Sequence, residues 1–311
     1  MRVVFFGTPE VAARTLEAVR SSAHEVVAVV TQPDRPRGRK GSPQPSEVKR
    51  AAGSLPVLQP ESPKQDGFAQ ELAAFEPDAL AVVAYGHILP RAVLAVAPAV
   101  NVHYSLLPAY RGAAPVQRAL MDGAERTGVS VFLLEPTVDT GPVLAREPIE
   151  VGEEETAGEV LERLTPIGAR LLVEVLGALA RGGAEPQPQD DALASPAPKI
   201  APHDRAVDWR EPARAIVNRV RALSPRPGAR ADFGGSPLIV LRARRVSVGE
   251  TTGGPGTVVS ADPLVIAAGE EGVELVTVQL AGKRAMGGAD FARGHAPVVG
   301  QPFGGQSARS G

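Results

Sequence analysis

The apolar residues of the first 180 positions fall into short runs separated by amphipathic stretches. RVVFF at 2–6, EVVAVV at 25–30 and ALAVVAYG at 79–86 are apolar throughout, which is typical of strands buried on both faces of a parallel sheet. Between them, the stretch from Val11 to Val19 places apolar residues at helical spacing. Short apolar strands alternating with helices predict an α/β fold with a doubly wound, mostly parallel sheet.

The first strand ends in Gly7-Thr8-Pro9-Glu10, which predicts a turn into a helix, with Thr8 as the capping residue and Pro9 in the first helical position. The turn lacks the further glycines of a dinucleotide fingerprint, which argues against a nicotinamide cofactor. The same patterns predict more strands at 99–103, 129–135 and 143–151, and helices at 89–97, 116–121 and 157–180.

The alternation of apolar runs and amphipathic stretches ends after residue 181. The stretch 182–202 is rich in Pro, Ala, Asp and Gln, which predicts an interdomain linker. Beyond it, a helix at about 212–223 precedes short apolar runs separated by Gly and Asp turns, which predict a small β-barrel of the OB type. We therefore expect a catalytic domain at 1–181, a linker at 182–203, a barrel at 204–300 and a disordered tail at 301–311.

Composition narrows the class of protein. A chain of 311 residues is longer than one compact domain usually is, and it holds no cysteine, which excludes disulfides, thiolate metal sites and cysteine nucleophiles. No apolar run reaches the length of a membrane span, and the N-terminus lacks the pattern of a signal peptide. We expect a cytoplasmic protein that makes no membrane contact.

Charge is distributed unevenly along the chain. The net charge is -2, but residues 204–311 hold 14 Lys and Arg against 10 Asp and Glu, which leaves the first 203 residues at a net charge of about -6. A basic C-terminal third suits contact with phosphates, and chance asymmetry on a solvated surface explains it equally well.

Three polar residues form the candidate catalytic set. Asn101 and His103 lie two residues apart at the end of an apolar strand, so the pleat points both to one side of the sheet, near the edge where ligands bind. Asp139 lies in the turn VDTGP at 138–142. Histidine transfers protons near neutral pH, Asn donates to an oxyanion, and Asp orients an imidazole and raises its pKa. The trio suits direct acyl transfer between two bound substrates, without a metal.

Structural readings of the same residues stay open. A lone histidine is more often a structural residue than a catalyst, and an Asp in a turn usually bonds its own backbone. The other histidines, His24, His87, His203 and His295, show no metal-ligand spacing. A basic stretch at 31–50 holds Arg35, Arg37, Arg39 and Lys40 among four prolines and two glycines, which suits either a solvated loop or contact with phosphates.

These motifs resemble a known family, the 10-formyltetrahydrofolate-dependent formyltransferases. The resemblance runs from residue 1 to Met286, and the basic loop with the appended barrel resembles the members that act on methionyl initiator tRNA. It is carried by FFGTPE at 5–10, TQPDRPRGR at 31–39, VVAYGHILP at 82–90, NVHYSLLPAYRGAAPVQ at 101–117, VDTGP at 138–142, VDW at 207–209 and AGKRAM at 281–286.

The resemblance implies a role for each matching residue. Asn101, His103 and Asp139 match the family's catalytic trio. The resemblance further implies a monomer that uses 10-formyltetrahydrofolate as co-substrate and methionyl initiator tRNA as acceptor. It assigns folate contacts to Ser105, Leu106, Leu107 and Pro108, a pterin-pocket wall to Val83, Ala84, Tyr85 and Gly86, and contacts to the acceptor stem of the tRNA to the loop from Arg35 to Lys40.

Three positions depart from the family pattern. Tyr104 stands where the family has a small residue, His87 replaces an aliphatic residue, and Arg226 lies in SPRP where Asn-Pro-Trp-Pro is typical. Two alternatives also stay open: a formyltransferase for another amine, such as an amino sugar nucleotide, and a non-catalytic RNA-binding protein on the same fold. The intact trio argues against the second.

Overall fold

The computed structural model describes residues 1–36, 41–249 and 253–303 and divides the chain into two compact units. The N-terminal unit comprises Met1–Pro115, Arg126–Glu150 and Leu161–Pro198. The C-terminal unit comprises Val116–Glu125, Val151–Val160 and Lys199–Gly311. Residues 182–198, the greater part of the predicted linker, thus belong to the N-terminal unit, while the expected domain boundaries stay a prediction.

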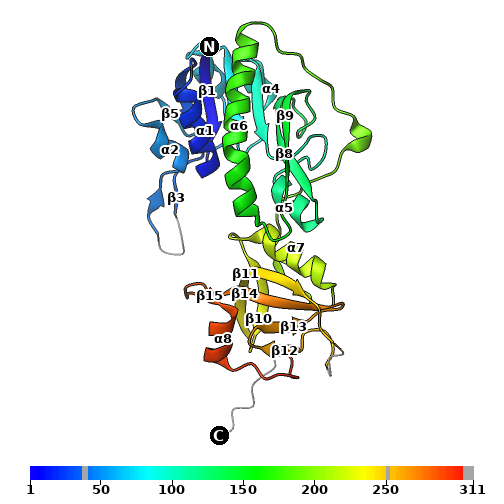
Figure 1. Cartoon of the computed structure of the whole chain (residues 1–311). Coiled ribbons are helices and arrows are strands. Elements are labelled where there is room, and N and C mark those ends of the chain that lie inside the picture. Colours follow the sequence, from blue (N-terminus) through cyan, green and yellow to red (C-terminus); the bar gives the residue numbers. More distant parts are fainter. Residues whose placement is uncertain (37–40, 250–252, 304–311) are drawn as a thin grey trace. The chain divides into compact units, whose positions relative to one another are not determined.

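The N-terminal unit is built on a seven-stranded sheet with the order β5-β2-β1-β6-β7-β8-β9 (Figure 1). The first five strands in this order pair in parallel, whereas β8 and β9 are antiparallel. Val3, Val4, Phe5 and Phe6 have no exposed surface, as expected for a central strand covered on both faces. The strands are β1 (Arg2–Gly7), β2 (Glu25–Val30), β5 (Val57–Leu58), β6 (Ala79–Val83), β7 (Ala99–His103), β8 (Arg126–Leu133) and β9 (Val143–Glu150).

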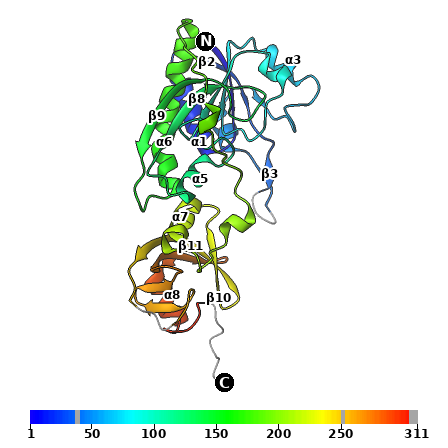
Figure 2. The ribbon, with the colours of Figure 1, turned by 90° about the vertical axis from the view of Figure 1, so that its right-hand side faces the viewer.

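Helices cover both faces of this sheet. Apolar residues of α3 and α4 pack in one cluster with Val4, Phe6 and Leu80 of the sheet. Figure 2 shows α1 and α6 together, away from α3. The helices are α1 (Glu10–Arg20), α2 (Glu47–Ala52), α3 (Phe68–Ala73), α4 (Arg91–Leu94), α5 (Pro115–Met121) and α6 (Ala157–Ala180). No helix in the described ranges combines the length and the apolar character needed to span a membrane.

The predicted cap of α1 is wrong. Pro9 occupies the N-cap position with an extended backbone, and Glu10 is the first helical residue. The Thr8 hydroxyl instead donates a hydrogen bond to the carbonyl of Tyr85 at 3.3 Å. Thr8 therefore ties the end of β1 to the loop after β6, a tertiary contact that competes successfully with local capping.

The C-terminal unit contains an antiparallel sheet with the order β10-β11-β14-β13-β12, and β15 pairs with β14. Ile216, Val240, Ile266 and Phe291 are fully buried in its core. With the doubly wound sheet, this unit confirms the predicted fold class. Its elements are a short 3-10 helix (Pro202–Arg205), α7 (Ala213–Leu223), β10 (Ala229–Phe233), β11 (Ser236–Val246), β12 (Val258–Ala261), β13 (Leu264–Ala267), β14 (Gly272–Leu280), β15 (Met286–Gly287) and α8 (Gly288–His295).

The ordered fold extends beyond residue 300, where the disordered tail was predicted to begin. Phe303 is buried among the core residues of the C-terminal unit. Its amide donates to the carbonyl of Gly256 at 2.7 Å, and its ring lies edge-on to Trp209. An aromatic side chain that finds an apolar site anchors the backbone around it, so the predicted start of the tail is corrected here. Residues 304–311 lie outside the described part of the chain.

Asp204 ties together separate segments of the C-terminal unit. It accepts hydrogen bonds from both terminal nitrogens of Arg118, at 3.0 and 2.7 Å, and from the amide of Ala201 at 2.7 Å. The Arg118 guanidinium is the main cause that lowers the pKa of Asp204 to about 2. A depressed carboxyl pKa stabilises the fold above the unfolded pKa, and this stabilisation is lost as the pH falls toward 2.

We expect Asp204→Asn to lower the free energy of unfolding by about 1–2 kcal/mol near neutral pH, since screening reduces the value of a partly exposed pair. The difference should shrink as the pH approaches 2, because the wild-type carboxylate is then protonated. Urea unfolding of the variant and the wild type, near neutral pH and again near pH 2, measures this difference in the free energy of unfolding. His203→Ala removes an exposed neighbour of Asp204 and serves as a control with little effect. An equal destabilisation at both pH values would contradict the stabilising role of the ionised Asp204 carboxylate.

Candidate active site

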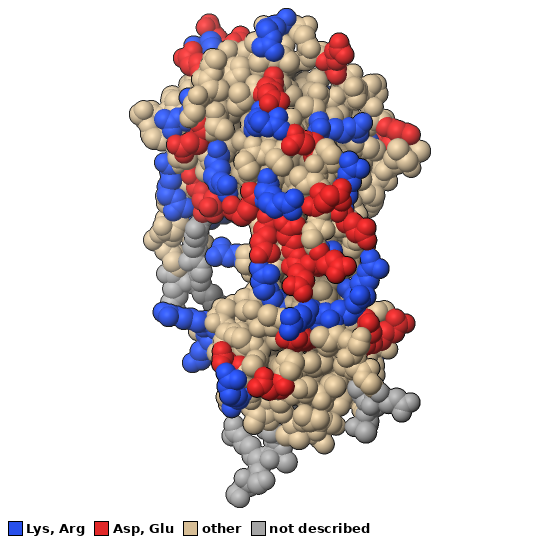
Figure 3. Space-filling model, viewed as in Figure 1, with Lys and Arg blue, Asp and Glu red and all other residues tan. Residues whose placement is uncertain are grey.

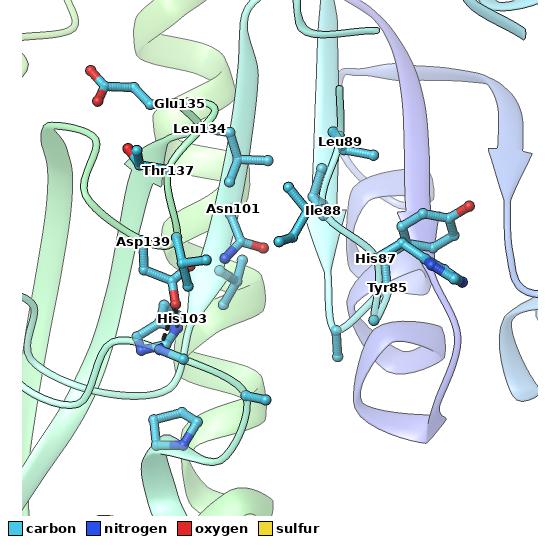
Figure 4. Close-up of a pocket in the computed structure, with 18 of the residues that line it drawn as sticks. Tyr85, His87, Ile88, Leu89, Asn101, His103, Leu134, Glu135, Thr137 and Asp139 are labelled. Carbon is cyan, nitrogen blue, oxygen red and sulfur yellow. Dashed lines mark hydrogen bonds and ion pairs between the residues drawn. The ribbon is translucent and has the colours of Figure 1, made fainter. Parts of the chain in front are cut away.

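A pocket of about 490 Å³ opens in the N-terminal unit beside the ends of β6 and β7 (Figure 4). The loop after β6, the end of α4, the end of β7, both ends of the loop between β7 and α5, and the loop after β8 form its wall. This is the sheet edge at which ligands of parallel α/β folds bind. Much of the wall is apolar, from Ile88, Leu89, Leu94, Leu134 and Val138.

Asn101 and His103 both face this pocket from β7, as the pleat predicts. The imidazole of His103 is buried, and the ring of Phe132 meets it edge-on with the ring centroids 6.3 Å apart. Asn101 is partly exposed, and its carboxamide makes no hydrogen bond to any other residue that the structure describes. The Asn101 amide is thus available to a bound molecule.

The structure brings Asp139 to His103. One carboxylate oxygen of Asp139 lies 3.6 Å from Nδ1 of His103, and the same oxygen accepts a hydrogen bond from the amide of Gly112 at 2.8 Å. Asp139 has a φ of 53°, in the left-handed region that few residues other than glycine adopt. The fold thus places the carboxylate of Asp139 beside the imidazole of His103, and the catalytic roles of both residues stay a prediction.

The proton positions of the pair follow from its partners. Nε2 of His103 lies 2.8 Å from the carbonyl oxygen of Tyr110. A carbonyl only accepts, so Nε2 carries a proton, and Nδ1 is the nitrogen that faces the carboxylate of Asp139. The carboxylate of Asp139 and the imidazole of His103 thus form one candidate site for holding or moving a proton.

Burial lowers the pKa of His103, and it outweighs the carboxylate of Asp139 and the carbonyl of Tyr110, which raise it. Asp139 thus acts in the direction expected of an Asp beside an imidazole, but burial has the larger effect. Desolvation disfavours the cation more than one carboxylate at 3.6 Å favours it. The lowered pKa favours the neutral imidazole.

The loop after β6 has an unusual backbone. Ala84 and Gly86 have φ values of 46° and 88°, and the carbonyl of Tyr85 accepts a hydrogen bond from the Gln32 amide at 2.9 Å. The positive φ of Gly86 favours glycine at this position, and a Cβ atom there would lie 2.6 Å from Nε2 of Gln32 and displace that side chain. Residues 84–87 of this loop line the pocket.

The expected pterin-wall residues divide into two groups. Ala84, Tyr85 and Gly86 line the pocket, whereas Val83 is fully buried in the sheet and does not. The phenol oxygen of Tyr85 is buried with no described hydrogen-bond partner, and burial raises its pKa to about 12. The ring nitrogen Nε2 of His87 is likewise buried without a described partner beside the pocket.

The four residues at 105–108 do not line the pocket. The Ser105 hydroxyl donates to the carbonyl of Ala109, and the amide of Leu107 donates to the Ser130 hydroxyl at 3.0 Å. Leu107 is only 1% exposed. These residues stabilise the turn that carries the chain from His103 to Tyr110, and their predicted contacts with folate stay a prediction.

Several wall residues were not among the predicted site residues. Glu135, Thr137 and Val138 line the pocket from the loop after β8, where an isolated sequence shows only ordinary turn residues. Gly112 and Ala113 also line the pocket, from the loop between β7 and α5. Tyr104, a departure from the family pattern, is buried, and its ring lies beside Gly168 of α6. The larger side chain therefore fills space between the sheet and this helix.

The basic loop is anchored at its base. Asp34 accepts hydrogen bonds from Lys49 at 2.8 Å and from Gln59 at 2.7 Å, next to a two-stranded ribbon of β3 (Arg35–Pro36) and β4 (Pro43–Gln44). Arg35 is exposed on this ribbon. The other three predicted tRNA-contacting residues, Arg37, Arg39 and Lys40, lie outside the described residues.

Comparison with known proteins identifies relatives along the whole chain. Residues 1–176 match the family described as formyl transferase, and residues 199–296 match its C-terminal domain. A methionyl-tRNA formyltransferase of Solibacter usitatus is 45% identical over 298 residues, which cover 94% of this chain and 96% of the relative.

Solved structures support the same fold. HypX from Aquifex aeolicus in complex with tetrahydrofolic acid superposes with a TM-score of 0.67 at 19% identity, over 94% of this chain and 47% of HypX. An N-formyltransferase from Helicobacter canadensis, in complex with folinic acid and dTDP-3-aminofucose, superposes with a TM-score of 0.64 at 13% identity, over 88% and 98% of the two chains.

Proposed function

The chain belongs to the formyl transferase family, and we propose that it transfers the formyl group of 10-formyltetrahydrofolate to the amino group of methionyl initiator tRNA. One observation carries the proposal: a pocket unites Asn101 with the His103–Asp139 pair, in a chain similar over 94% of its length to a methionyl-tRNA formyltransferase. Because such substrates belong to translation, we propose that the protein acts in the cytoplasm.

The pocket fits a folate co-substrate. Its volume of about 490 Å³ lies in the range of small-molecule sites, and its wall combines apolar side chains with residues 84–87 of the loop after β6. We assign the flat, polar pterin ring to that loop, and the apolar residues Ile88, Leu94 and Val138 to the rest of the molecule. When bound, the co-substrate supplies the formyl group beside Asn101 and His103.

The trio then acts on the two reacting nitrogen atoms and the formyl oxygen. Asn101 donates its amide hydrogen to the oxygen that gains negative charge as the methionyl nitrogen bonds to the formyl carbon. The His103–Asp139 pair accepts the proton that this nitrogen loses. It returns the proton to N10 of the folate as the bond from N10 to the formyl carbon breaks. Oxyanion donors typically contribute about 10²–10³ in rate, and acid–base groups about 10²–10⁴.

Contacts with the RNA acceptor are assigned to basic residues that lack acidic partners. Many arginines of the C-terminal unit are neutralised, as the pairs Arg219–Glu211, Arg244–Glu274 and Arg245–Glu271 illustrate. Figure 3 shows both basic and acidic residues over the face in view. Arg226 and Arg230 are exposed and form no ion pair with any described acid, so we assign phosphate contacts to them and to the loop from Arg35 to Lys40.

Replacing Arg37, Arg39 and Lys40 together with Ala should weaken the affinity for tRNA and leave folate binding unchanged. Each lost phosphate contact should reduce the slope of log affinity against log salt by about 0.9, or less where the RNA is single-stranded. Titrations of methionyl-tRNA at several salt concentrations measure this slope. Lys64→Ala, an exposed charge elsewhere in the N-terminal unit, is the control. Equal slopes for the triple variant and the wild type would rule out phosphate contacts by this loop.

A single assay tests the proposed function. The protein is mixed with 10-formyltetrahydrofolate and either methionyl initiator tRNA or an amino sugar nucleotide, and formylated product is quantified for each acceptor. Formyl-methionine on the tRNA is the expected product, and the His103→Ala variant should form far less of it. Preference for the sugar nucleotide would assign another acceptor. Binding of tRNA with no product from either acceptor would indicate a non-catalytic RNA-binding protein.

A further inference from the structure

Residues 187–197 of the predicted linker lie along the loop that follows His103 and beside the turn that holds Asp139. Gln187 exchanges two backbone hydrogen bonds with Val143, both 2.8 Å long. The hydroxyl of Ser195 accepts from the amide of Tyr110, and the carbonyl of Ser195 accepts from the amide of Arg111. All of these residues belong to the N-terminal unit. The segment is thus part of the structure around the site.

The contact between the segment and the loop is close. The amide of Ala197 donates to the carbonyl of Arg111 at 2.6 Å. At Gly112, φ is 132°, and a Cβ atom would lie 2.4 Å from the carbonyl oxygen of Ala197. Only glycine permits this approach, and the amide of the same Gly112 donates to Asp139.

Gln189 connects the two parts of the site with one side chain. Its amide nitrogen donates to the carbonyls of Asp139, at 2.9 Å, and Gly141, at 2.7 Å. Its amide oxygen accepts from Nε and Nη2 of Arg111, at 3.1 and 2.8 Å. Both donor hydrogens and both lone pairs of the carboxamide are therefore used, so its orientation is fixed.

These bonds form a closed network around the catalytic pair. Arg111 lies between Tyr110, whose carbonyl accepts from His103, and Gly112, whose amide donates to Asp139. The side-chain oxygen of Gln189 accepts a hydrogen bond from Arg111, and its side-chain nitrogen donates one to the backbone of the Asp139 turn. Movement of Gln189 would therefore displace the partners of both His103 and Asp139. Gln189 itself is not part of the pocket wall.

We propose that Gln189 is a positioning residue for the reaction: it holds the Asp139 turn and the loop at 110–112 at the separation that aligns the His103–Asp139 pair. This role rests on the proposed function of that pair. Misplacement of a catalytic group by about 1 Å can lower a rate about 10²-fold, which sets the scale of the effect.

Two substitutions and a matched control test the role. Gln189→Ala removes all four hydrogen bonds of this side chain. Gln189→Glu keeps the size of the side chain and an oxygen that accepts from Arg111, but it places a second acceptor against the carbonyls of Asp139 and Gly141. We expect each to lower kcat about 10–100-fold and to change the KM of either substrate less than about threefold. Asp191→Asn removes an exposed ion pair with the same Arg111 and should leave kcat within about twofold of the wild type.

A double-mutant cycle separates positioning from a general structural role. If Gln189 acts through Asp139, then Gln189→Ala should lower kcat less than about threefold in a protein that already carries Asp139→Asn. If Gln189→Ala lowers kcat by the same factor in the wild type and in Asp139→Asn, the proposal is overturned. A wild-type kcat in both Gln189 variants would overturn it as well. Should Gln189→Ala fail to fold, Gln189→Glu takes its place in the cycle.

The ring of His103 provides a readout that needs no substrate. Nitrogen-15 spectra report the protonation and hydrogen bonding of each of the five histidines, and His103→Gln identifies the relevant signals. The His103 ring shifts should change in Gln189→Ala and stay unchanged in Asp191→Asn. Unchanged shifts in both variants would overturn the proposal. Absence of formylation by the wild type would refute the proposed function alone, since the ring shifts would still test the link from Gln189 to the pair.

Discussion

Replacing Asp139 with Asn should lower kcat about 10²–10⁴-fold without unfolding the protein, because it removes the carboxylate that lies beside Nδ1 of His103 and keeps the shape of the side chain. An Asn oxygen can still accept from the amide of Gly112, which now bonds the carboxylate at 2.8 Å. Its NH₂ group would then face Nδ1 of His103 and could not take up a proton, which leaves the imidazole as the only base of the pair.

The pH dependence of the same variant has a defined sign. The groups that face His103 are the carboxylate of Asp139, the carbonyl of Tyr110 and the uncharged ring of Phe132. Burial lowers the pKa of His103, while Asp139 opposes that shift, so Asp139→Asn should lower this pKa further. If unprotonated His103 accepts the proton, activity is lost as the pH falls through its pKa. The acid limb of kcat should therefore move to lower pH in the variant.

Rate profiles of the wild type and Asp139→Asn with the same acceptor measure this shift, because protonation of the acceptor amine then contributes equally to both. Asp191→Asn, an exposed carboxylate on the neighbouring segment, is the control for a general change in charge. An acid limb that moves to higher pH, or a variant with wild-type kcat, would contradict the assigned role of the pair.

Replacing Asn101 with Ala should lower kcat about 10²–10³-fold, the usual cost of losing one oxyanion donor. The KM of either substrate should change little, because the hydrogen bond strengthens as charge develops in the transition state. The melting temperature should stay close to that of the wild type, since the carboxamide bonds to no other described residue and is partly exposed.

Asn101→Asp distinguishes donation from side-chain size. It preserves the shape of the residue and replaces the NH₂ donor with a negatively charged acceptor next to the developing oxyanion. We expect it to be at least as slow as Asn101→Ala. Steady-state kinetics with both substrates varied, together with thermal unfolding, give the comparison. Near-normal turnover by Asn101→Asp would show that the residue only fills space.

Local patterns in the sequence predicted much of the N-terminal fold. The apolar run AVNVH was expected to form a strand at 99–103 and does so with these bounds, and the amphipathic stretch at 157–180 forms α6 with its predicted ends. A strand buried on both faces must be apolar along its length, and a helix must repeat its apolar residues at its own period, so both leave a pattern in a single sequence.

The candidate site was predictable where its chemistry is local. Asn101 and His103 share one strand, and the alternation of a pleated strand places both on one face. Their motif and VDTGP also resemble a family, which supplied the pairing of Asp139 with His103. The composition of the turn alone favoured an Asp that bonds its own backbone. Only the folded chain shows Nδ1 of His103 3.6 Å from Asp139 and the burial that lowers the His103 pKa.

Contacts between segments far apart in the chain left no pattern to read. The Pro-rich composition of 182–202 predicted a linker, yet Gln189 bonds Arg111, 78 positions earlier, and the turn at Asp139. Phe303 similarly stands in a polar, glycine-rich ending but is buried in the core of the C-terminal unit. The sequence by itself determined the strands, the helices, the family and the chemical types of the site residues, because propensity and periodicity act between neighbours. The tertiary structure alone decided which distant groups share hydrogen bonds and which are removed from water, because both depend on how the segments pack together.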